Sequence, residues 1–380
     1  MMHTGSKNFS IAFLDQYADM GGGQQVMLAL LEAALSLKLR VSLYCPVGQL
    51  TQRAAHMGVR IVPIPELSLR KGKKRFVDML SLAAYSFRFL WTQRTSLRGH
   101  DLIYVNGPRL CPAALLYSFL NRKMRFACHV HLLHNQTDTC LISLFLKRKA
   151  CLGAALPSRF IEKRMHGNLP AVVAQKLHLV ENGLGQAFSE LNFVDRFSNA
   201  SSFGVMIVGR ICPEKGYNLL PGLARVFPQI AFHAIGKVWA EDAAWFEALR
   251  GDVSANLIFH GESTDIPRLV AELRPQFCLI PSQVDEAFGL AAIEGMALSC
   301  LTIVRQQGAL AELAVGTGAW SFVKDEDVAT LLGKGMALSK EALLAESRGQ
   351  YQMVMTRYSH AAWAKRLRDW LRILTGQEEA

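Results

Sequence analysis

The sequence predicts an α/β protein made of two successive domains, each with parallel strands and helices. Its 380 residues, 51% of them hydrophobic, suffice for two cores. Short apolar runs of strand length alternate with segments of helical periodicity, and this series restarts after a polar, turn-rich stretch at residues 195–202. We therefore expect one domain over residues 1–195 and a second over residues 203–360.

The first half opens with a strand–helix–strand unit at residues 10–14, 24–37 and 41–44. Further strands are expected at residues 59–64, 101–105, 126–132, 156–158 and 177–181, and a helix at 76–91. Three glycines, Gly21, Gly22 and Gly23, fall at the first strand-to-helix turn. Without Cβ atoms they let the backbone approach a phosphate at the helix N-terminus, and a plain tight turn is the alternative.

The second half repeats the alternation, with strands expected at residues 205–208, 231–235, 256–260, 277–280 and 301–304. In such folds ligands bind at the carboxyl ends of the strands, so we expect a site in a cleft between the two domains. Arg210 and Lys215 lie in the loop after the first of these strands, between Gly209 and Gly216. This pair suits a diphosphate, and solvated surface cations are the alternative.

Two carboxylates distinguish the stretch from Pro281 to Glu294, which follows a strand predicted to be buried. The pattern predicts a strand-to-helix loop that ends at Glu286 and opens an apolar helix, with Glu294 about two turns further in on roughly the same face. Backbone N–H groups of Phe288, Gly289 and Leu290 would be free to bind an anion at the start of this helix. Two solvated acids on a surface helix are the alternative, but the apolar flanks favour a site.

Composition excludes several classes of protein. The eight cysteines are scattered without a C-x-x-C pair, which favours reduced thiols over a disulfide framework or a zinc site. No run of 18 uninterrupted apolar residues predicts a membrane span, and the first apolar run is too short for a signal peptide. We therefore expect a cytoplasmic protein.

The net charge of +11 is unevenly distributed. Residues 1–195 hold 24 Lys and Arg against 11 Asp and Glu, whereas the remainder holds 18 against 20. This asymmetry indicates an anionic partner for the first half, such as a lipid surface, a diphosphate-linked acceptor or nucleic acid, and solubilising charge is the alternative.

A basic cluster precedes the aromatic helical segment at residues 76–91. It consists of Arg70, Lys71, Lys73, Lys74 and Arg75. A cationic loop that leads into an amphipathic, aromatic-rich helix is typical of a membrane-surface contact. A core helix with a solvated entry loop is the alternative, and the charge asymmetry favours the membrane.

Three histidines, His129, His131 and His134, lie at the end of the strand expected at residues 126–132. Alternation places His129 and His131 on one face of that strand. No carboxylate or cysteine stands at ligand spacing, so a substrate contact is favoured over a metal site.

Together these motifs resemble the retaining nucleotide-sugar glycosyltransferases of family 4. The resemblance covers the whole chain and rests on four motifs in order: G-R-x-x-x-x-K-G from Gly209, P-S-x-x-x-E-A-F-G-L-x-x-I-E from Pro281, the Asn182-Gly183 turn and the G-A-L-A-E loop from Gly308. It implies the GT-B fold of two facing Rossmann-like domains. The helix expected within residues 361–380 would cross back to the first domain.

The resemblance also implies roles for individual residues. Glu294 would bind the ribose hydroxyls of the nucleotide, and Glu286 would contact the donor sugar. Arg210 and Lys215 would neutralise the diphosphate. His131 matches the histidine that closes the family's catalytic strand, so the implied catalytic residues are Glu286, His131, Arg210 and Lys215. The implied donor-binding set is Gly22, Gly23, Gly209, Arg210, Lys215, Gly261, Glu262, Ser263, Glu286, Phe288, Gly289, Leu290 and Glu294, with the base near Glu262 and Ser263.

The activity implied by the resemblance is transfer of a hexose-type sugar from a nucleoside-diphosphate sugar to a saccharide acceptor. We expect a lipid-linked acceptor in surface polysaccharide synthesis, such as lipopolysaccharide, O-antigen or exopolysaccharide, and a peripheral enzyme at the inner face of the plasma membrane. We expect no nucleic-acid partner and no cofactor, and the absence of a D-x-D-like metal motif between the two halves is consistent with metal-independent transfer. A soluble transferase for a metabolite or protein, a sugar-nucleotide epimerase and a silent GT-B scaffold are the alternatives.

Several positions depart from the family's pattern. Gln24 and Gln25 replace a more typical Ala/Ser-Glu pair after the glycines, and Leu184-Gly185 follows the Asn182-Gly183 turn in place of Val-Asp. The base, the sugar, the acceptor and the linkage are left open by these motifs.

Overall fold

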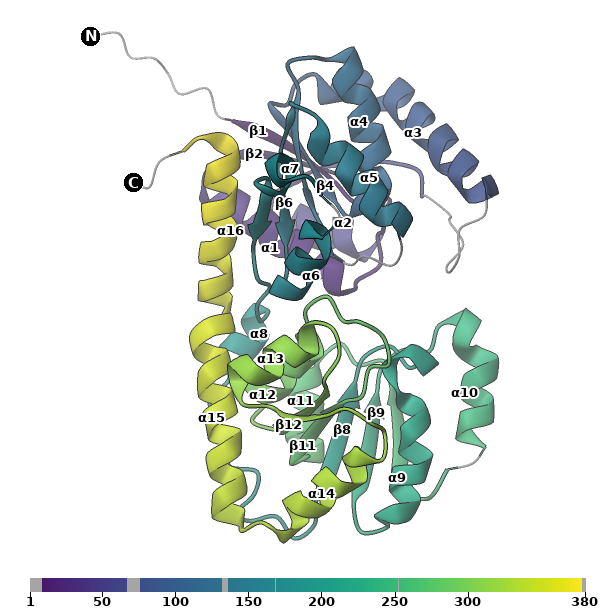
Figure 1. The fold of residues 1–380 in the computed structure, drawn as a ribbon, viewed down its shortest axis with the longest axis vertical. Coiled ribbons are helices and arrows are strands. Elements are labelled where there is room, and N and C mark those ends of the chain that lie inside the picture. The colour runs from purple at the N-terminus through teal and green to yellow at the C-terminus, as the bar shows by residue number, and fades with distance from the viewer. Residues whose placement is uncertain (1–8, 67–75, 132–135, 168, 252, 378–380) are drawn as a thin grey trace, which may run out of the picture. The chain divides into compact units, whose positions relative to one another are not determined.

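The protein is described here by a computed structural model that covers residues 9–66, 76–131, 136–167, 169–251 and 253–377. The chain divides into two compact units (Figure 1). Unit 1 comprises Met1–Glu181 and Ala364–Ala380, and unit 2 comprises Asn182–Trp363. The basic cluster of residues 70–75 and His134 lie outside the described residues, so their predicted roles stay predictions.

Unit 1 is built on a parallel sheet with the strand order β3-β2-β1-β4-β5-β6-β7. Its strands are β1 (Ser10–Leu14), β2 (Arg40–Cys45), β3 (Arg60–Pro63), β4 (Leu102–Asn106), β5 (Arg125–His129), β6 (Cys151–Leu156) and β7 (Leu177–Leu179). Its helices are α1 (Gly22–Ser36), α2 (Gln49–His56), α3 (Phe76–Leu97), η1 (Pro108–Leu110), α4 (Cys111–Leu120), α5 (Gln136–Lys147), α6 (Arg159–His166) and α7 (Ala171–Ala174). Strands β1 and β4 are buried along their whole length, as expected for a parallel sheet covered by helices on both faces.

Two sequence predictions in unit 1 need correction. The strand expected at residues 156–158 is β6, which ends at Leu156, while Ser158 caps α6 by accepting a hydrogen bond from the Ile161 amide at 3.3 Å. The lysine and arginine residues at 147–149 separate α5 from β6, and the apolar run across them concealed that boundary. Strand β5 ends at His129, so His131 lies beyond the strand.

Unit 2 is built on a second parallel sheet with the order β10-β9-β8-β11-β12-β13. Its strands are β8 (Gly204–Val208), β9 (Ala231–Ile235), β10 (Leu257–Gly261), β11 (Phe277–Ile280), β12 (Leu301–Arg305) and β13 (Trp320–Phe322). The last of these was missed, because its three residues give no usable alternation. Its helices are α8 (Gln186–Ser189), η2 (Pro213–Lys215), η3 (Tyr217–Leu219), α9 (Leu220–Val226), η4 (Ala240–Asp242), α10 (Ala243–Arg250), α11 (Ile266–Leu273), α12 (Leu290–Ala297), α13 (Ala309–Thr317), α14 (Asp327–Ala337) and α15 (Lys340–Tyr358).

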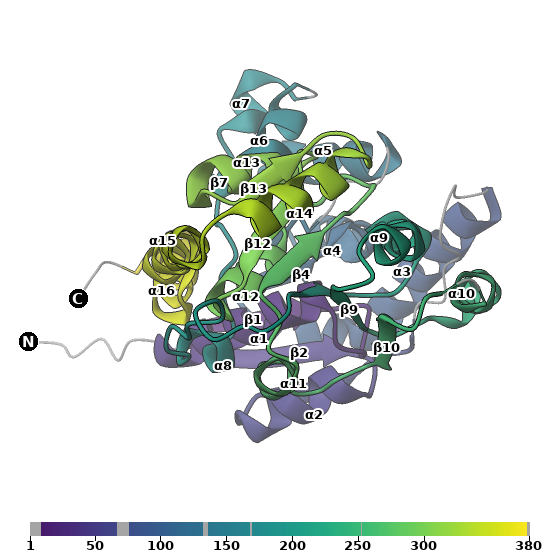
Figure 2. The same ribbon diagram turned by 90° about the horizontal axis from the view of Figure 1, so that it is seen from below.

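Helices cover both faces of this second sheet. One core joins it to α9, α10 and α14, and the other joins it to α11, α12, α13 and α15. Figure 2 shows α9 and α11 on opposite sides of β9. The two units are therefore Rossmann-like α/β layers, which confirms the predicted fold class.

The last helix, α16 (His360–Thr375), begins in unit 2 and continues into unit 1 from Ala364. In unit 1 it buries Trp370, whose indole N–H donates to the Tyr104 hydroxyl at 3.0 Å. The segment at residues 182–203 packs in unit 2, where Phe197 is fully buried and the Arg196 guanidinium donates to the Leu298 carbonyl at 2.7 Å. All eight cysteines are free thiols, and seven of them are buried, as predicted for reduced residues.

Candidate functional site

The predicted site residues of unit 2 lie in loops that follow its parallel strands. Gly209 and Arg210 follow β8, Glu262 follows β10, and the stretch from Pro281 follows β11. Because all strands of the sheet are parallel, these loops lie at the same edge. The sheet thereby brings cations and carboxylates from distant parts of the sequence to one edge.

An ion pair connects two of these loops. The Lys215 ammonium pairs with the Glu286 carboxylate, and the Ser282 hydroxyl donates to the same Glu286 oxygen at 2.8 Å. Both charged side chains are partly exposed, at 34% for Lys215 and 19% for Glu286. The pair therefore presents its charges to solvent and is open to competition by a ligand.

Backbone geometry brings these two loops together. Gly216 has a φ of 78°, and a Cβ at this residue would lie 2.2 Å from the Pro281 carbonyl oxygen. Gly308 has a φ of 59°, and its Cβ would lie 2.8 Å from the backbone of Glu286. Only glycine allows both this backbone conformation and this close approach, so the motif glycines shape the Glu286 loop.

The position of Glu286 corrects one prediction. Helix α12 begins at Leu290, so Glu286 lies in the loop before the helix and does not share a helix face with Glu294. Gly289 caps α12 without a side-chain hydrogen bond, and the N–H groups of its first turn lack intrahelical partners. Phe288 is buried against Tyr358, with a ring-centroid distance of 5.5 Å, and this contact anchors the loop.

Glu294 lies in the second turn of α12. Burial raises its pKa from the ordinary 4.5 to about 7, because a carboxylate loses hydration there. Nearby Cys278 and Thr302 pack around Gly295, the next residue of the helix. Glu294 is therefore a carboxyl group poised between its two charge states near neutral pH.

Arg210 takes part in a separate cluster. Its guanidinium pairs with Glu214 at 2.5 Å and lies over the Trp239 ring, 4.4 Å from the centroid. The side chain is 23% exposed. The arginine is thus held flat by an aromatic ring, an arrangement that suits binding of a planar or bidentate anion.

A groove of about 540 Å³ runs beside β10 in unit 2. Its lining includes two predicted donor residues, Gly261 and Glu262, together with Lys237, which pairs with Glu262 at 3.6 Å. Apolar side chains of α10 and β10, such as Phe246 and Phe259, form the rest of its wall. Ser263 lies in the following loop, where its hydroxyl accepts from the Asp265 amide at 3.2 Å.

Unit 1 holds a second group of polar residues at the carboxyl ends of β1 and β4. Asp15 follows β1 and is 1% exposed, and the Asn106 amide donates to it at 2.6 Å. The same amide nitrogen donates to the Gly23 carbonyl at 3.1 Å, and the Asn106 side-chain oxygen lies 2.5 Å from His131 Nε2. The structure thereby joins His131 to the glycine turn that contains Gly22 and Gly23.

Burial shifts the titration of this cluster. The pKa of Asp15 rises to about 6 because desolvation outweighs the hydrogen bonds that favour its ionised form. The pKa of His131 falls to about 4, because burial disfavours the imidazolium. At neutral pH the cluster therefore contains an ionised aspartate and a neutral histidine.

Sequence reasoning missed Asp15, Asn106 and Ser282 as members of these clusters. The signal was available for the first two, because each stands at or just beyond the end of a strand, and β1 pairs with β4. The Gln24 amide lies 3.3 Å from both Asp15 oxygens, which gives the unusual glutamine after the glycines a partner.

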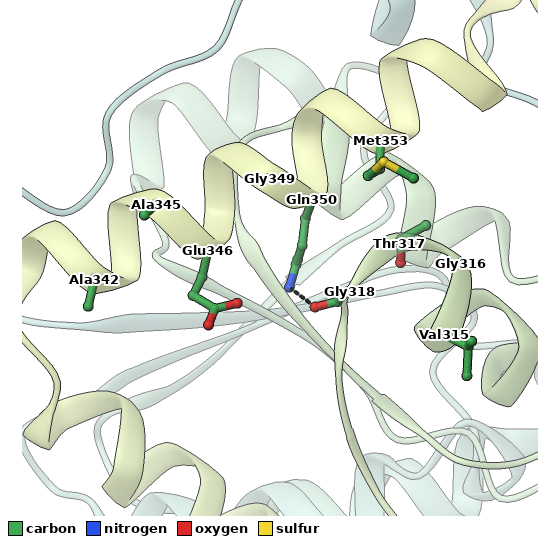
Figure 3. Close-up of a pocket in the computed structure, with 10 residues that line it drawn as sticks. All are labelled: Val315, Gly316, Thr317, Gly318, Ala342, Ala345, Glu346, Gly349, Gln350 and Met353. Atoms are coloured by element: carbon green, nitrogen blue, oxygen red, sulfur yellow. Dashed lines mark hydrogen bonds between the residues drawn. The ribbon is translucent and has the colours of Figure 1, made fainter.

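Another hollow of unit 2 lies away from these residues. It measures about 630 Å³ between the C-terminal end of α13 and the helix α15, where Gln350 donates to the Gly318 carbonyl at 3.1 Å (Figure 3). None of the predicted site residues lines it. We therefore place the candidate site at the strand ends.

Comparison with known proteins gives one family match and several structural likenesses. Residues 190–351 match the family model for glycosyl transferases group 1, and no curated protein matches the chain in sequence. Anabaena HepE in complex with UDP and glucose is 17% identical with a TM-score of 0.77, over 95% of this chain and 98% of that one. Sucrose-phosphate synthase from Thermosynechococcus elongatus is 16% identical with a TM-score of 0.78, over 97% and 99%.

A third solved structure resembles the whole chain. The lipopolysaccharide outer core galactosyltransferase WaaB in its apo form is 14% identical with a TM-score of 0.67, over 97% of this chain and 99% of that one. At such identities these likenesses concern the fold. The family match covers most of unit 2, including Lys215, Glu286 and Glu294.

Proposed function

We propose that this chain, which is a group 1 glycosyltransferase with the GT-B fold, transfers a hexose from a UDP-sugar to a saccharide acceptor with retention of anomeric configuration. The observation that carries the proposal is the cluster at the carboxyl edge of unit 2. It combines two cations, a helix N-terminus without a side-chain cap and two carboxylates within the region that matches the family.

Each part of this cluster suits one part of a sugar nucleotide. Lys215, Arg210 and the first N–H groups of α12 would bind the diphosphate, where negative charge grows as the anomeric bond breaks. Glu294, in its ionised form, would accept hydrogen bonds from the ribose hydroxyls. Glu286, held by Ser282, would face the hydroxyls of the sugar, and the groove beside Gly261, Glu262 and Ser263 would hold the base.

The proposed reaction is a displacement on one face of the sugar. The anomeric carbon loses its bond to the diphosphate oxygen and gains a bond to the acceptor oxygen. The acceptor proton passes to the leaving phosphate oxygen, so no histidine–aspartate base is required. This chemistry assigns Lys215 and Arg210 to charge stabilisation, which typically contributes about 3–4 kcal/mol per well-placed donor.

The choice of UDP is a proposal that rests on structural neighbours. HepE has been solved with UDP, with UDP and glucose, and with UDP-glucose. We extend this donor class to the present chain, with the base and sugar as the parts to be tested first.

We further propose a lipid-linked acceptor of surface polysaccharide synthesis and a peripheral enzyme at the cytoplasmic face of the plasma membrane. Exposed apolar side chains on three neighbouring helices of unit 1 support this: Phe87 and Trp91 on α3, Leu116, Phe119 and Leu120 on α4, and Leu144 on α5. Arginines accompany the rings, with Arg94 4.5 Å from the Trp91 centroid and Arg148 4.0 Å from that of Phe119. Such aromatic and cationic surfaces suit the headgroup region of an anionic bilayer.

In the described residues no helix is long and apolar enough to span a membrane. Contact with the bilayer would therefore involve the surface described above, together with the predicted contribution of residues 70–75. A transferase that acts on a small metabolite or protein in solution is the alternative, and it would show no affinity for vesicles.

Thermal unfolding with added nucleotides tests the donor assignment. We expect UDP and UDP-glucose to raise the melting temperature, since a ligand at 100 times its Kd stabilises the fold by about 2.7 kcal/mol. GDP- and dTDP-sugars at the same concentration should have a smaller effect. No shift with any nucleotide sugar would contradict the function, whereas a shift without sugar transfer to any acceptor would identify a silent nucleotide-binding scaffold.

A further inference from the structure

The amide of Asn106 has three polar neighbours in unit 1, and they fix its orientation. Its nitrogen lies 2.6 Å from Asp15 Oδ2 and 3.1 Å from the Gly23 carbonyl oxygen, while its oxygen lies 2.5 Å from His131 Nε2. A backbone carbonyl can only accept a hydrogen bond. A flipped amide would therefore direct its oxygen at two acceptors, so the Asn106 nitrogen must face Asp15 and Gly23.

This orientation determines which nitrogen of His131 carries the proton. Because the Asn106 oxygen is an acceptor, the Nε2 atom of His131 must donate to it, and the neutral ring must be the Nε2–H tautomer. Nδ1 then keeps its lone pair. The ring approaches Gly23 through Cδ2, which lies 3.4 Å from the position of a Cβ on that glycine, so Nδ1 belongs to the opposite edge of the ring.

His129 packs against His131 and helps to hold its ring in place. The rings of His129 and His131 stack with centroids 4.7 Å apart and planes 11° apart. His129 Nδ1 lies 3.1 Å from the Tyr104 hydroxyl, which accepts the indole N–H of Trp370 at 3.0 Å. The Tyr104 hydroxyl can therefore donate its hydrogen to His129 Nδ1. This contact fixes the His129 ring to the core of unit 1.

We propose that Asn106, anchored by Asp15, is a positioning residue that holds His131 as its Nε2–H tautomer, so that Nδ1 accepts a hydrogen bond from a hydroxyl group of a sugar substrate bound at this edge of unit 1. This inference rests on the proposed function for its substrate, but its geometric part concerns this chain alone. It assigns His131 a neutral accepting role. It thereby excludes His131 as a cation for the leaving diphosphate.

The tautomer can be measured in the free protein. We suggest two-bond ¹H–¹⁵N correlation spectra of protein with ¹⁵N-labelled histidine, with His131 assigned from the spectrum of His131→Gln. The wild type should show His131 protonated at Nε2. In Asn106→Leu the signals should move towards a mixture of tautomers, whereas wild-type protein with His131 protonated at Nδ1 would overturn the proposal.

Two further variants keep the test decisive if Asn106→Leu fails to fold. Gln24→Leu is the matched control, because it also removes an Asp15 partner but leaves the His131 contact intact, so its tautomer should equal that of the wild type. Asn106→Asp retains an acceptor for Nε2 and should retain the tautomer, with a proton shared between its carboxyl group and Asp15 in place of the amide donor. The positioning role of Asn106 would be contradicted if His131 were protonated at Nδ1 in Asn106→Asp. It would also be contradicted if Gln24→Leu showed the mixture of tautomers expected for Asn106→Leu.

Kinetics separate this proposal from the proposed function. With UDP-glucose as the probe and UDP release as the readout, Asn106→Leu should lower kcat at least tenfold, and KM should change less than threefold. A wild-type kcat with a scrambled tautomer would overturn the positioning role and leave the transferase assignment intact. If the wild type turns over no sugar nucleotide, both the proposed function and the proposed sugar contact of His131 are wrong. The NMR spectra still determine the tautomer of His131 in that case.

Discussion

The Lys215 ammonium forms an ion pair with the Glu286 carboxylate at the carboxyl edge of unit 2. The two residues are 71 positions apart and belong to different motifs. A diphosphate at this edge would compete with Glu286 for Lys215, and the released carboxylate would then be available for sugar hydroxyls. The pair therefore connects binding of the leaving group to the contact proposed for the sugar.

We expect Lys215→Ala to lower turnover by about 10²–10³-fold, as removal of one electrostatic donor does in other active sites. The matched control is Arg268→Ala, which removes an exposed ion pair with Glu272 in the same unit and should leave turnover unchanged. Steady-state kinetics with UDP-glucose provide the measurement. Wild-type turnover in Lys215→Ala would remove this residue from the site.

The pKa of Glu294 gives donor binding a pH dependence. Ribose hydroxyls require the ionised carboxylate as acceptor, so UDP should bind more weakly as the pH falls below about 7. Calorimetric titrations between pH 5.5 and 8 in several buffers should show that binding releases a proton near pH 6.5. Glu294→Gln should lose most of the affinity and all of this pH dependence, and an unchanged profile in that variant would contradict the ribose contact.

The raised pKa of Glu294 makes the folding stability of the free protein fall as the pH rises, which is opposite to its effect on donor binding. Its folded-state pKa of about 7 exceeds the ordinary 4.5, so its contribution to folding is fully present below about pH 4.5 and is lost as the pH rises to about 7. Asp15, with a pKa raised to about 6, has the same sign over a lower range. In urea unfolding of the free protein, Glu294→Gln should reduce the loss of stability between pH 5 and 7.5. A steeper loss in that variant would contradict the assignment.

The surface of α3 offers a test of membrane contact. The double variant Phe87→Ser, Trp91→Ser should bind vesicles of anionic lipid at least about tenfold more weakly. Each aromatic ring that is buried in the bilayer contributes roughly 1.5–3 kcal/mol to binding. Added salt should weaken wild-type binding as well. Val315→Ser on α13, where the native side chain is 90% exposed, is the control in unit 2. Equal sedimentation of all three proteins with vesicles would contradict the proposed surface.

Metal-independent transfer is predicted from the sequence, because no D-x-D-like metal motif lies between its two halves. We expect turnover in excess EDTA to stay within twofold of its value in buffer. A loss of activity that added Mn²⁺ or Mg²⁺ restores would contradict metal-independent transfer.

Substitutions of Trp370 test how much α16 contributes to the stability of unit 1. Its side chain is 1% exposed, and its truncation to Ala should cost about 3–5 kcal/mol of unfolding free energy. Trp370→Phe should cost less, because it keeps most of the packing and loses the bond to Tyr104. Denaturant unfolding followed by circular dichroism measures both, and a cost for Ala below 1 kcal/mol would contradict the burial.

The regular elements of both units could be predicted because their strands are continuous apolar runs. Strands β9 and β11 coincide with their predicted bounds, since both faces of a covered parallel sheet demand apolar residues. The helix after Pro281 was placed too early, because the apolar residues of the Glu286 loop imitate helical periodicity. The loop conformation instead depends on Gly308, which lies more than 20 residues away.

The polar clusters were harder to predict than the strands. Lys215 and Glu286 were chosen singly for their motifs, and their ion pair depends on the approach of Gly216 to Pro281. Asp15 and Asn106 are ordinary residues in the sequence. Their polar cluster forms because β1 pairs with β4, which places the ends of the two strands together although Asp15 and Asn106 are 91 positions apart.

The return of α16 to unit 1 has a consequence for synthesis on the ribosome. The pocket around Tyr104 and His129 stays open until Trp370 has been translated, because the indole that fills it comes from the end of the chain. Unit 2 is made in between, and its roughly 180 residues take about 10–40 s at ordinary elongation rates. During that time the nascent first unit exposes apolar surface, so its maturation waits for synthesis of α16 and is a point at which chaperones can act.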